Sequence, residues 1–291
     1  MSGSAIQKRI NPKPADLGEF SVKRALPATS QKMVGPFIFF DHFGPTEFEP
    51  GKGVAVRPHP HIGISTVTYL FEGEIIHRDS LGYEQPIQPG AVNWMTAGKG
   101  IVHSERTRPS VVETGSKMHG IQAWVALPVE DEECEPDFMH YPKEGLPESD
   151  SNGVWMRLIC GAAFEMESEV KSHSPIFYVE IKTDVGATVV LPDQYTERAL
   201  YLVSGALRIE GEIIKEGEFI VFRAGAIPTI ESLETSRFML LGGEPLEGDR
   251  TVWWNFVSSR KDRIEQAKLD WKQNRFEAVP GESEFIPLPE N

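Results

Sequence analysis

Residues 57–71 read RPHPHIGISTVTYLF, which is a pair of histidines followed by a run typical of a β-strand. The run after position 64 is rich in Thr, Val and aromatic residues and stops at a Glu-Gly pair, which indicates a strand and then a turn. His59 and His61 lie two positions apart, and the prolines beside them favour extended backbone. Because alternate side chains of a strand point to the same face, both imidazoles are predicted to face one side.

The sequence on either side of this stretch predicts more short strands. They are expected at residues 75–79, 91–95, 101–105 and 121–127, and turn residues separate them. The chain holds 26 glycines and 22 prolines, a larger share of turn-forming residues than usual. The expected fold class is therefore all-β, as an antiparallel sandwich or barrel.

The pattern occurs twice. Residues 201–205 (YLVSG) echo residues 69–73 (YLFEG), so two copies of one strand-rich unit are the simplest interpretation. Residues 129–150 contain nine acidic residues and three prolines, which predicts an irregular connection between the copies. We therefore expect two tandem domains, at residues 1–140 and 141–291.

Near the C-terminus the pattern changes to that of a short helix. Ser258 or Ser259 is a candidate N-cap, and Ile264, Ala267 and Trp271 recur at helical spacing. A helix that covers the outside of a sheet is the favoured interpretation, and the proline-rich tail after it predicts an extended strap.

Charge and cysteine content exclude several classes of protein. The net charge is −14, which is the wrong sign for gripping phosphate backbones, so direct nucleic-acid binding is not expected. Cys134 and Cys160 are too few for a disulfide framework, and a bystander thiol is favoured over a redox role for Cys134. No apolar stretch is long enough for a signal peptide or a membrane span, so we expect a soluble cytoplasmic protein without membrane contact.

A second pair at two-residue spacing, His103 and Glu105, follows a glycine loop on another predicted strand. If the fold brings the two strands together, three imidazoles and one carboxylate converge. His59, His61, His103 and Glu105 are therefore the candidate metal ligands. Such a set suits a first-row transition metal, with iron the usual choice where oxygen chemistry follows. Four protein ligands leave open positions for substrate, which distinguishes a working metal from a structural one.

The remaining histidines do not share this spacing, and a structural or surface role is favoured for each: His42, His77, His119, His140 and His173. His119 lies on a predicted strand and could also support a ligand. In the second copy, Leu191, Asp193, Ile230 and Ser232 stand where the ligands would be. We therefore expect a metal in the first half, and a second half without one whose interior is closed by side chains.

These features resemble the pirin family, whose members are bicupins. The resemblance rests on residues 40–45 (FDHFGP), 57–61 (RPHPH), 66–70 (TVTYL), 93–105 (NWMTAGKGIVHSE), 242–246 (GGEPL) and 253–259 (WWNFVSS). It implies two cupin barrels and a metal held by His59, His61, His103 and Glu105. In one respect the sequence departs from the family, because Ser65 stands where pirins usually carry a glutamate that is not a ligand.

The resemblance implies one metal ion per chain, Fe(II) first and Mn, Ni, Cu or Zn as alternatives, and two kinds of activity. One is the quercetin 2,3-dioxygenase reaction on a flavonol-like aromatic substrate, with Glu105 as the candidate base. The other is a redox-sensing regulator that binds a partner protein through a surface controlled by the metal. A stable bicupin with a vestigial metal is the third possibility, and fold alone does not decide among them.

Overall fold

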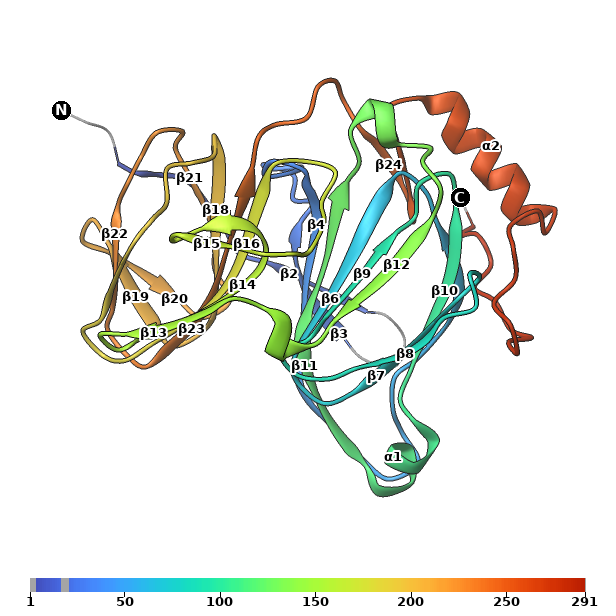
Figure 1. The fold of residues 1–291 in the computed structure, drawn as a ribbon, viewed down its shortest axis with the longest axis horizontal. Helices are drawn as coiled ribbons and strands as arrows, with labels where there is room; N and C mark the ends of the chain where they lie inside the picture. The colour runs from blue at the N-terminus through green and yellow to red at the C-terminus, as the bar shows by residue number, and fades with distance from the viewer. Residues whose placement is uncertain (1–3, 17–20, 291) are drawn as a thin grey trace. The chain divides into compact units, whose positions relative to one another are not determined.

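The computed structural model describes residues 4–16 and 21–290, and these are mostly β-structure (Figure 1). The chain divides into two compact units. The 40–143 unit comprises Ala15–Val22, Phe40–Lys143 and Glu247–Asn291. The 144–246 unit comprises Met1–Pro14, Lys23–Phe39 and Glu144–Leu246. The C-terminal segment, which the sequence assigned to the second domain, is thus grouped with residues 40–143. The domain boundary at 140/141 stays a prediction.

Four sheets and one two-stranded ribbon contain the strands. A seven-stranded sheet has the order β12 (Asp137–Tyr141), β9 (Val92–Thr96), β6 (Ile64–Glu72), β11 (Ser116–Ala126), β4 (Phe37–Phe48), β3 (Ser21–Leu26) and β2 (Lys13–Asp16). A four-stranded sheet of the 40–143 unit has the order β5 (Ala55–His61), β10 (Ile101–Arg106), β7 (Ile75–Asp79) and β8 (Glu84–Ile87). The ribbon pairs β24 (Thr251–Trp253) with β25 (Phe256–Ser258).

The 144–246 unit contains the other two sheets. One has the order β1 (Ile6–Ile10), β21 (Phe219–Phe222), β18 (Glu197–Ser204), β23 (Ser236–Gly243), β16 (Ile176–Thr183), β14 (Val154–Ala163) and β13 (Glu148–Ser151), and β15 (Met166–Glu167) also pairs with β14. The other has the order β17 (Thr188–Val190), β22 (Thr229–Ser232), β19 (Ala206–Ile209) and β20 (Glu212–Lys215). The all-β class is confirmed, whereas closure of either unit into a barrel stays a prediction.

The strands expected in the first half are present as β6, β7, β9, β10 and β11. The acidic connection at residues 129–150 is less irregular than expected. Its first part forms a short 3₁₀ turn, η1 (Val129–Asp131), and then β12, which pairs with β9. After a second 3₁₀ turn, η2 (Lys143–Gly145), β13 pairs with β14. Acidic residues are tolerated in these strands because Asp137, the one acidic residue of β12, is exposed at its start, and all of β13 faces solvent.

The helix expected near the C-terminus is α2 (Lys261–Lys272), which buries Ile264 and Ala267. The predicted serine N-cap is wrong, because the helix begins after Arg260 and has no side-chain cap. Ser258 and Ser259 instead donate their hydroxyls to the buried carboxylate of Glu132, at 3.1 and 2.9 Å. A second helix, α1 (Pro109–Thr114), was not anticipated.

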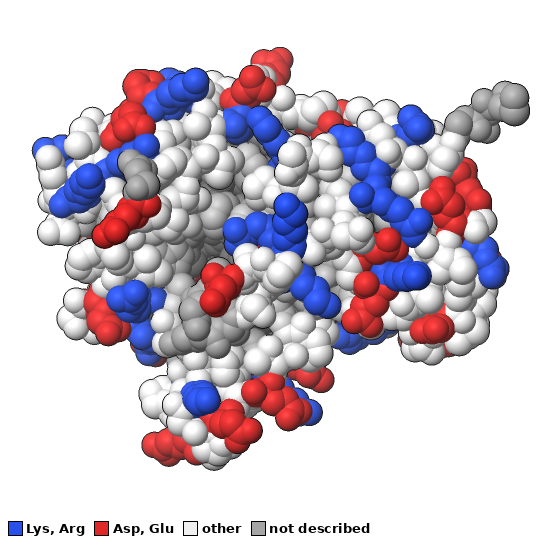
Figure 2. Space-filling model, turned by 180° about the vertical axis from the view of Figure 1, so that it is seen from behind, with Lys and Arg blue, Asp and Glu red and all other residues white. Residues whose placement is uncertain are grey.

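Figure 2 shows Lys and Arg interspersed with Asp and Glu on the face seen there, without a broad area of positive charge. Among residues 4–16 and 21–290, no helix is both long and apolar enough to cross a membrane.

Candidate metal centre

Two antiparallel strands, β5 and β10, position the predicted histidines. His59 lies opposite His103, and His61 lies opposite Ile101. The register shifts after this pair, so that Glu105 lies opposite Val56. The extra residue of this bulge lies on β5, whereas β10 pairs with β7 without interruption from His103 to Arg106. Alternation along β10 therefore keeps Glu105 on the same face of its strand as His103.

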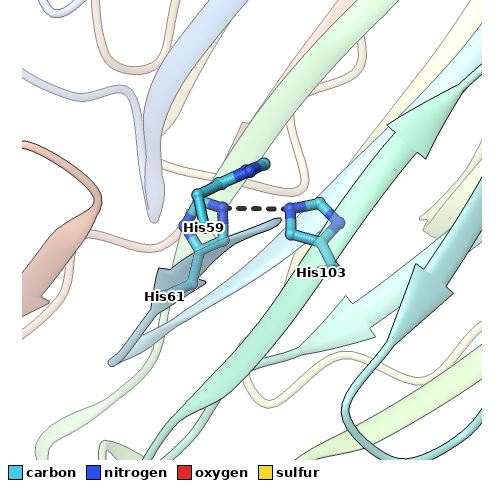
Figure 3. A group of neighbouring side chains, drawn as sticks. All are labelled: His59, His61 and His103. Atoms are coloured by element: carbon cyan, nitrogen blue, oxygen red, sulfur yellow. Dashed lines mark hydrogen bonds between the residues drawn. The ribbon is translucent and has the colours of Figure 1, made fainter. Parts of the chain in front are cut away.

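The three imidazoles meet in the interior of the 40–143 unit (Figure 3). His59, His61 and His103 are 7%, 2% and 2% exposed, and one ring nitrogen of each lies within 4.8 Å of the others. The Nε2 atoms of His61 and His103 are 3.1 Å apart. Two nitrogens that bind one metal ion at about 2.1 Å and at right angles lie about 3.0 Å apart. The spacing therefore fits a shared first-row metal ion.

The protonation states of the three imidazoles also favour metal binding, because an imidazole must be neutral to bind a metal ion. Burial lowers the pKa of His59 from 6.5 to about 4. Burial and the neighbouring imidazoles lower the pKa of His61 and of His103 well below 6.5. The Nδ1 atom of His59 lies 2.9 Å from the carbonyl oxygen of Arg57, to which it donates, and this leaves Nε2 unprotonated. The cluster is thus neutral at physiological pH.

Glu105 is close to this group without belonging to it. The group of ligand atoms within 4.8 Å of one another contains only the three histidines among the residues described. The hydroxyl of Thr68 lies 3.4 Å from the Glu105 carboxyl group and 3.0 Å from the side-chain oxygen of Gln122. Burial raises the pKa of Glu105 to about 7, and the Thr68 hydroxyl opposes this. Its role as fourth ligand stays a prediction.

Sequence reasoning missed the support behind His103. His77 is buried, and its Nδ1 atom lies 3.4 Å from Nδ1 of His103. Its Nε2 atom donates to Asp79 across 2.8 Å, and its ring stacks on Phe138 with centroids 4.3 Å apart. His77 is thus hydrogen-bonded, as expected, although its neighbour is a candidate ligand. The two-residue spacing of His77 and Asp79 on a predicted strand was the signal that could have identified the pair.

The C-terminal segment holds the ligand strands from the side away from the cluster. Glu282 accepts hydrogen bonds from Ser104 at 2.9 Å and from Arg106 at 2.9 and 2.7 Å. The backbone N–H of Ile286 donates to the carbonyl of Pro58 across 2.8 Å. These contacts fix the residues next to His59 and between His103 and Glu105. The expected extended strap therefore supports the site.

The remaining histidines, for which a structural or surface role was expected, do not belong to the cluster. His42 and His119 pair with each other at 2.8 Å, and His140 pairs with Asn93 at 2.7 Å. His173 is exposed. Ser65, in the position of the family's glutamate, is buried and hydrogen-bonded to Thr96 at 3.0 Å.

Both cysteines are free thiols, and burial raises the pKa of each, to about 12 for Cys160. Neither is therefore primed as a reactive thiolate.

In the 144–246 unit, the positions that correspond to the ligands carry no imidazole. Leu191 and Ile230 are buried in its hydrophobic core, Ser232 bonds to Thr183, and Asp193 is exposed. Side chains therefore fill this interior, and the absence of a metal there stays a prediction.

Comparison with known proteins adds the family. The profile for Pirin matches residues 19–125, and that for the Pirin C-terminal cupin domain matches residues 178–277. A pirin-like protein of Caulobacter vibrioides is 52% identical over 280 residues, which cover 94% of this chain and 96% of that protein. The tandem cupin organisation expected from the sequence is thereby confirmed.

Solved structures agree with this assignment. A quercetin 2,3-dioxygenase from Acinetobacter baumannii has a TM-score of 0.91 at 33% identity, over 98% of this chain and 95% of that one. A bacterial pirin from Escherichia coli in complex with nickel(II) shares the fold, with a TM-score of 0.66 at 18% identity over 82% of this chain and 99% of that one. With both halves matched and half of its residues identical to those of a pirin-like protein, the chain belongs to the pirin family.

Proposed function

We propose that this pirin is an iron-dependent dioxygenase of the quercetin 2,3-dioxygenase type, which opens the ring of a flavonol-like aromatic substrate. The observation that carries the proposal is the buried cluster of three neutral imidazoles with nitrogens at metal-binding distance. His59, His61 and His103 would hold the ion, with Glu105 as fourth ligand. The likeness to the Acinetobacter baumannii dioxygenase supports the reaction class.

A bound iron ion would supply Lewis acidity and one-electron chemistry with dioxygen. The chain itself supplies the remaining parts. Glu105, with a pKa of about 7, is suited to take a proton from a substrate hydroxyl near neutral pH. The single proton of the Thr68 hydroxyl can go either to Glu105 or to Gln122, so this residue can adapt to both charge states of the carboxyl group.

The surroundings of the cluster are suited to an aromatic substrate. Trp124 lies edge-on to His61 with ring centroids 5.1 Å apart, and it is 7% exposed. A largely buried indole beside the imidazoles gives the site an apolar wall and limits access of water. Such a wall favours a flat, hydrophobic ligand over a small polar one.

The test is purification without oxygen, followed by metal analysis and oxygen-uptake assays with quercetin. Oxygen uptake that scales with iron content, and its loss in His61→Ala together with the iron, would support the enzyme. The matched control is His173→Ala, which removes an exposed histidine and should change neither quantity. Full iron occupancy with no uptake would refute the enzyme and favour the redox-sensing regulator.

A further inference from the structure

We propose that Asp79 and His77 are positioning residues that fix the proton of His103 on Nδ1 and so keep Nε2 free to bind the metal. The inference concerns the metal site of the proposed function and rests on it for its purpose. The proton arrangement itself belongs to the metal-free protein. It can therefore be tested whether or not the protein is an enzyme.

Asp79 sets which atoms donate and which accept in the hydrogen bonds that lead through His77 to His103. Its side chain is fully buried, and Oδ1 accepts the backbone N–H groups of Leu81 and Tyr83 at 2.9 and 3.1 Å. A carboxylate that receives two backbone donors acts as an acceptor. Its Oδ2 atom therefore accepts the proton of His77 Nε2 across 2.8 Å. In its neutral form, the ring of His77 is thereby left with Nδ1 as an acceptor.

The same direction continues into the metal site. His77 Nδ1 faces His103 Nδ1 at 3.4 Å, so His103 has to supply the proton of that contact. A neutral imidazole has one N–H, which leaves Nε2 of His103 unprotonated. This is the atom that lies 3.1 Å from Nε2 of His61. His103 is thus held in the form that a metal ion requires.

His61 completes the arrangement. Without a metal ion, Nε2 of His61 donates to Nε2 of His103, because the latter has no proton to give. The Nδ1 atom of His61 is buried and makes no hydrogen bond of ordinary geometry among the described residues, although the backbone of Asn255 lies close enough to oppose the lowering of the His61 pKa. Its proton can move to Nδ1 when a metal ion takes Nε2.

The surroundings hold His77 in this orientation. Its ring is stacked on Phe138 with an angle of 10° between the planes. The ring of Tyr83 also contacts Phe138, at 5.2 Å between centroids. Rotation of His77 would break the stacking and both nitrogen contacts together. Supporting groups that orient a ligating histidine in this way usually contribute 10- to 100-fold to metal affinity.

Asp79→Asn gives the sharpest test, because it nearly preserves the shape of the side chain and reverses the direction of the hydrogen bonds from residue 79 to His103. The backbone donors of Leu81 and Tyr83 keep the amide oxygen facing them, so the NH₂ group faces His77. His77 then has to accept at Nε2 and donate from Nδ1, which forces the proton of His103 onto Nε2. We expect nickel(II) affinity to fall about 10- to 100-fold.

The experiment combines two measurements. In metal-free protein with ¹⁵N-labelled histidine, NMR shows which ring nitrogen of His103 carries the proton, with assignment by a His103→Asn variant. The expected result is Nδ1 in the wild type and Nε2 in Asp79→Asn. A proton on Nε2 in the wild type, or an unchanged Nδ1 proton in Asp79→Asn, would overturn the proposal. Because no metal is present, these results are independent of the dioxygenase assay.

The second measurement is nickel(II) affinity in variants of His77. His77→Phe keeps the stacked ring and loses the acceptor, and affinity should fall at least tenfold. His77→Asn places an oxygen near the former Nδ1 and should stay within about threefold of the wild type. His140→Phe is the matched control, because it removes a hydrogen-bonded histidine of the same unit away from the ligands. Equal affinity of His77→Phe and the wild type would contradict a positioning role.

Discussion

Replacement of Glu105 by glutamine should remove most of the pH dependence of metal binding. The wild-type carboxyl group, with its pKa raised to about 7, holds a proton below that pH, and a metal ion has to displace it. Metal affinity therefore falls as pH falls. The ionised fraction drops from nine tenths at pH 8 to one hundredth at pH 5. Affinity should thus decrease roughly 90-fold over this range, which is about 2.7 kcal/mol.

The histidines should contribute little to this slope. The pKa of His59 is lowered to about 4, and those of His61 and His103 lie well below 6.5. Protonation of His59 weakens affinity by only about a tenth at pH 5. Glu105→Gln should bind more weakly than the wild type at pH 8, and its affinity should change less than about twofold between pH 8 and pH 5.

The assay is a competition titration of nickel(II) against a chelator of known pH-dependent affinity. Glu113→Gln, which changes an exposed carboxylate on α1, is the control and should keep the wild-type slope. Circular dichroism at each pH checks that the variants are folded. A slope of the same size in Glu105→Gln and the wild type would show that another group carries the proton, and would refute the reasoning.

Three further predictions concern the site and the two units. His59→Ala and His103→Ala should each lower the metal content at least tenfold by elemental analysis. Far-UV circular dichroism should stay unchanged, because hydrophobic cores stabilise a chain of this size without a metal. Cooperative unfolding of either variant near room temperature would show that the metal is structural. Gly63→Ala should lower the free energy of unfolding by about 3 kcal/mol or more, because a Cβ at this position overlaps a backbone carbonyl oxygen. Gly82→Ala is the control, because Gly82 also has a positive φ but has open space around it. In the same urea titration it should lower the free energy of unfolding by only about 1 kcal/mol. Arg198→Met should cost about 3 kcal/mol, because the buried guanidinium donates to three backbone carbonyls, and a loss below 1 kcal/mol would contradict that role.

The strands and the histidines of the site were predictable because each depends on local pattern. Alternation of side chains placed His59 and His61 on one face, and the run after them formed β6 as expected. The second pair, His103 and Glu105, was predicted to act as a unit. Among the described residues, the group at ligand distance contains the three histidines, and which side chains gather there depends on the pairing of two strands far apart in the sequence.

Other features depend on long-range competition for partners. The serines before α2 are of a residue type that often caps helices, but their hydroxyls donate hydrogen bonds to the buried carboxylate of Glu132 instead. His77 had the same spacing from Asp79 as the ligand pairs, yet its position behind His103 follows from the order of β5, β10 and β7 in the sheet. Spacing therefore predicted that pairs exist, and only the fold decides which pairs meet.

The hydrogen bonds of Glu282 with Ser104 and Arg106, here called the clasp, have a consequence for the synthesis of the protein. Ser104 and Glu282 are 178 positions apart, so a ribosome adding about 5 to 20 residues per second completes the ligand strands roughly 10 to 40 s before the clasp emerges. During that interval the nascent chain carries His59, His61 and His103 on strands that lack the contacts of Glu282. A metal ion bound during that interval would therefore meet ligand strands without the support that they have after release. A chain that ends before Glu282 would keep His59, His61 and His103 and lose the hydrogen bonds that Glu282 makes with their strands.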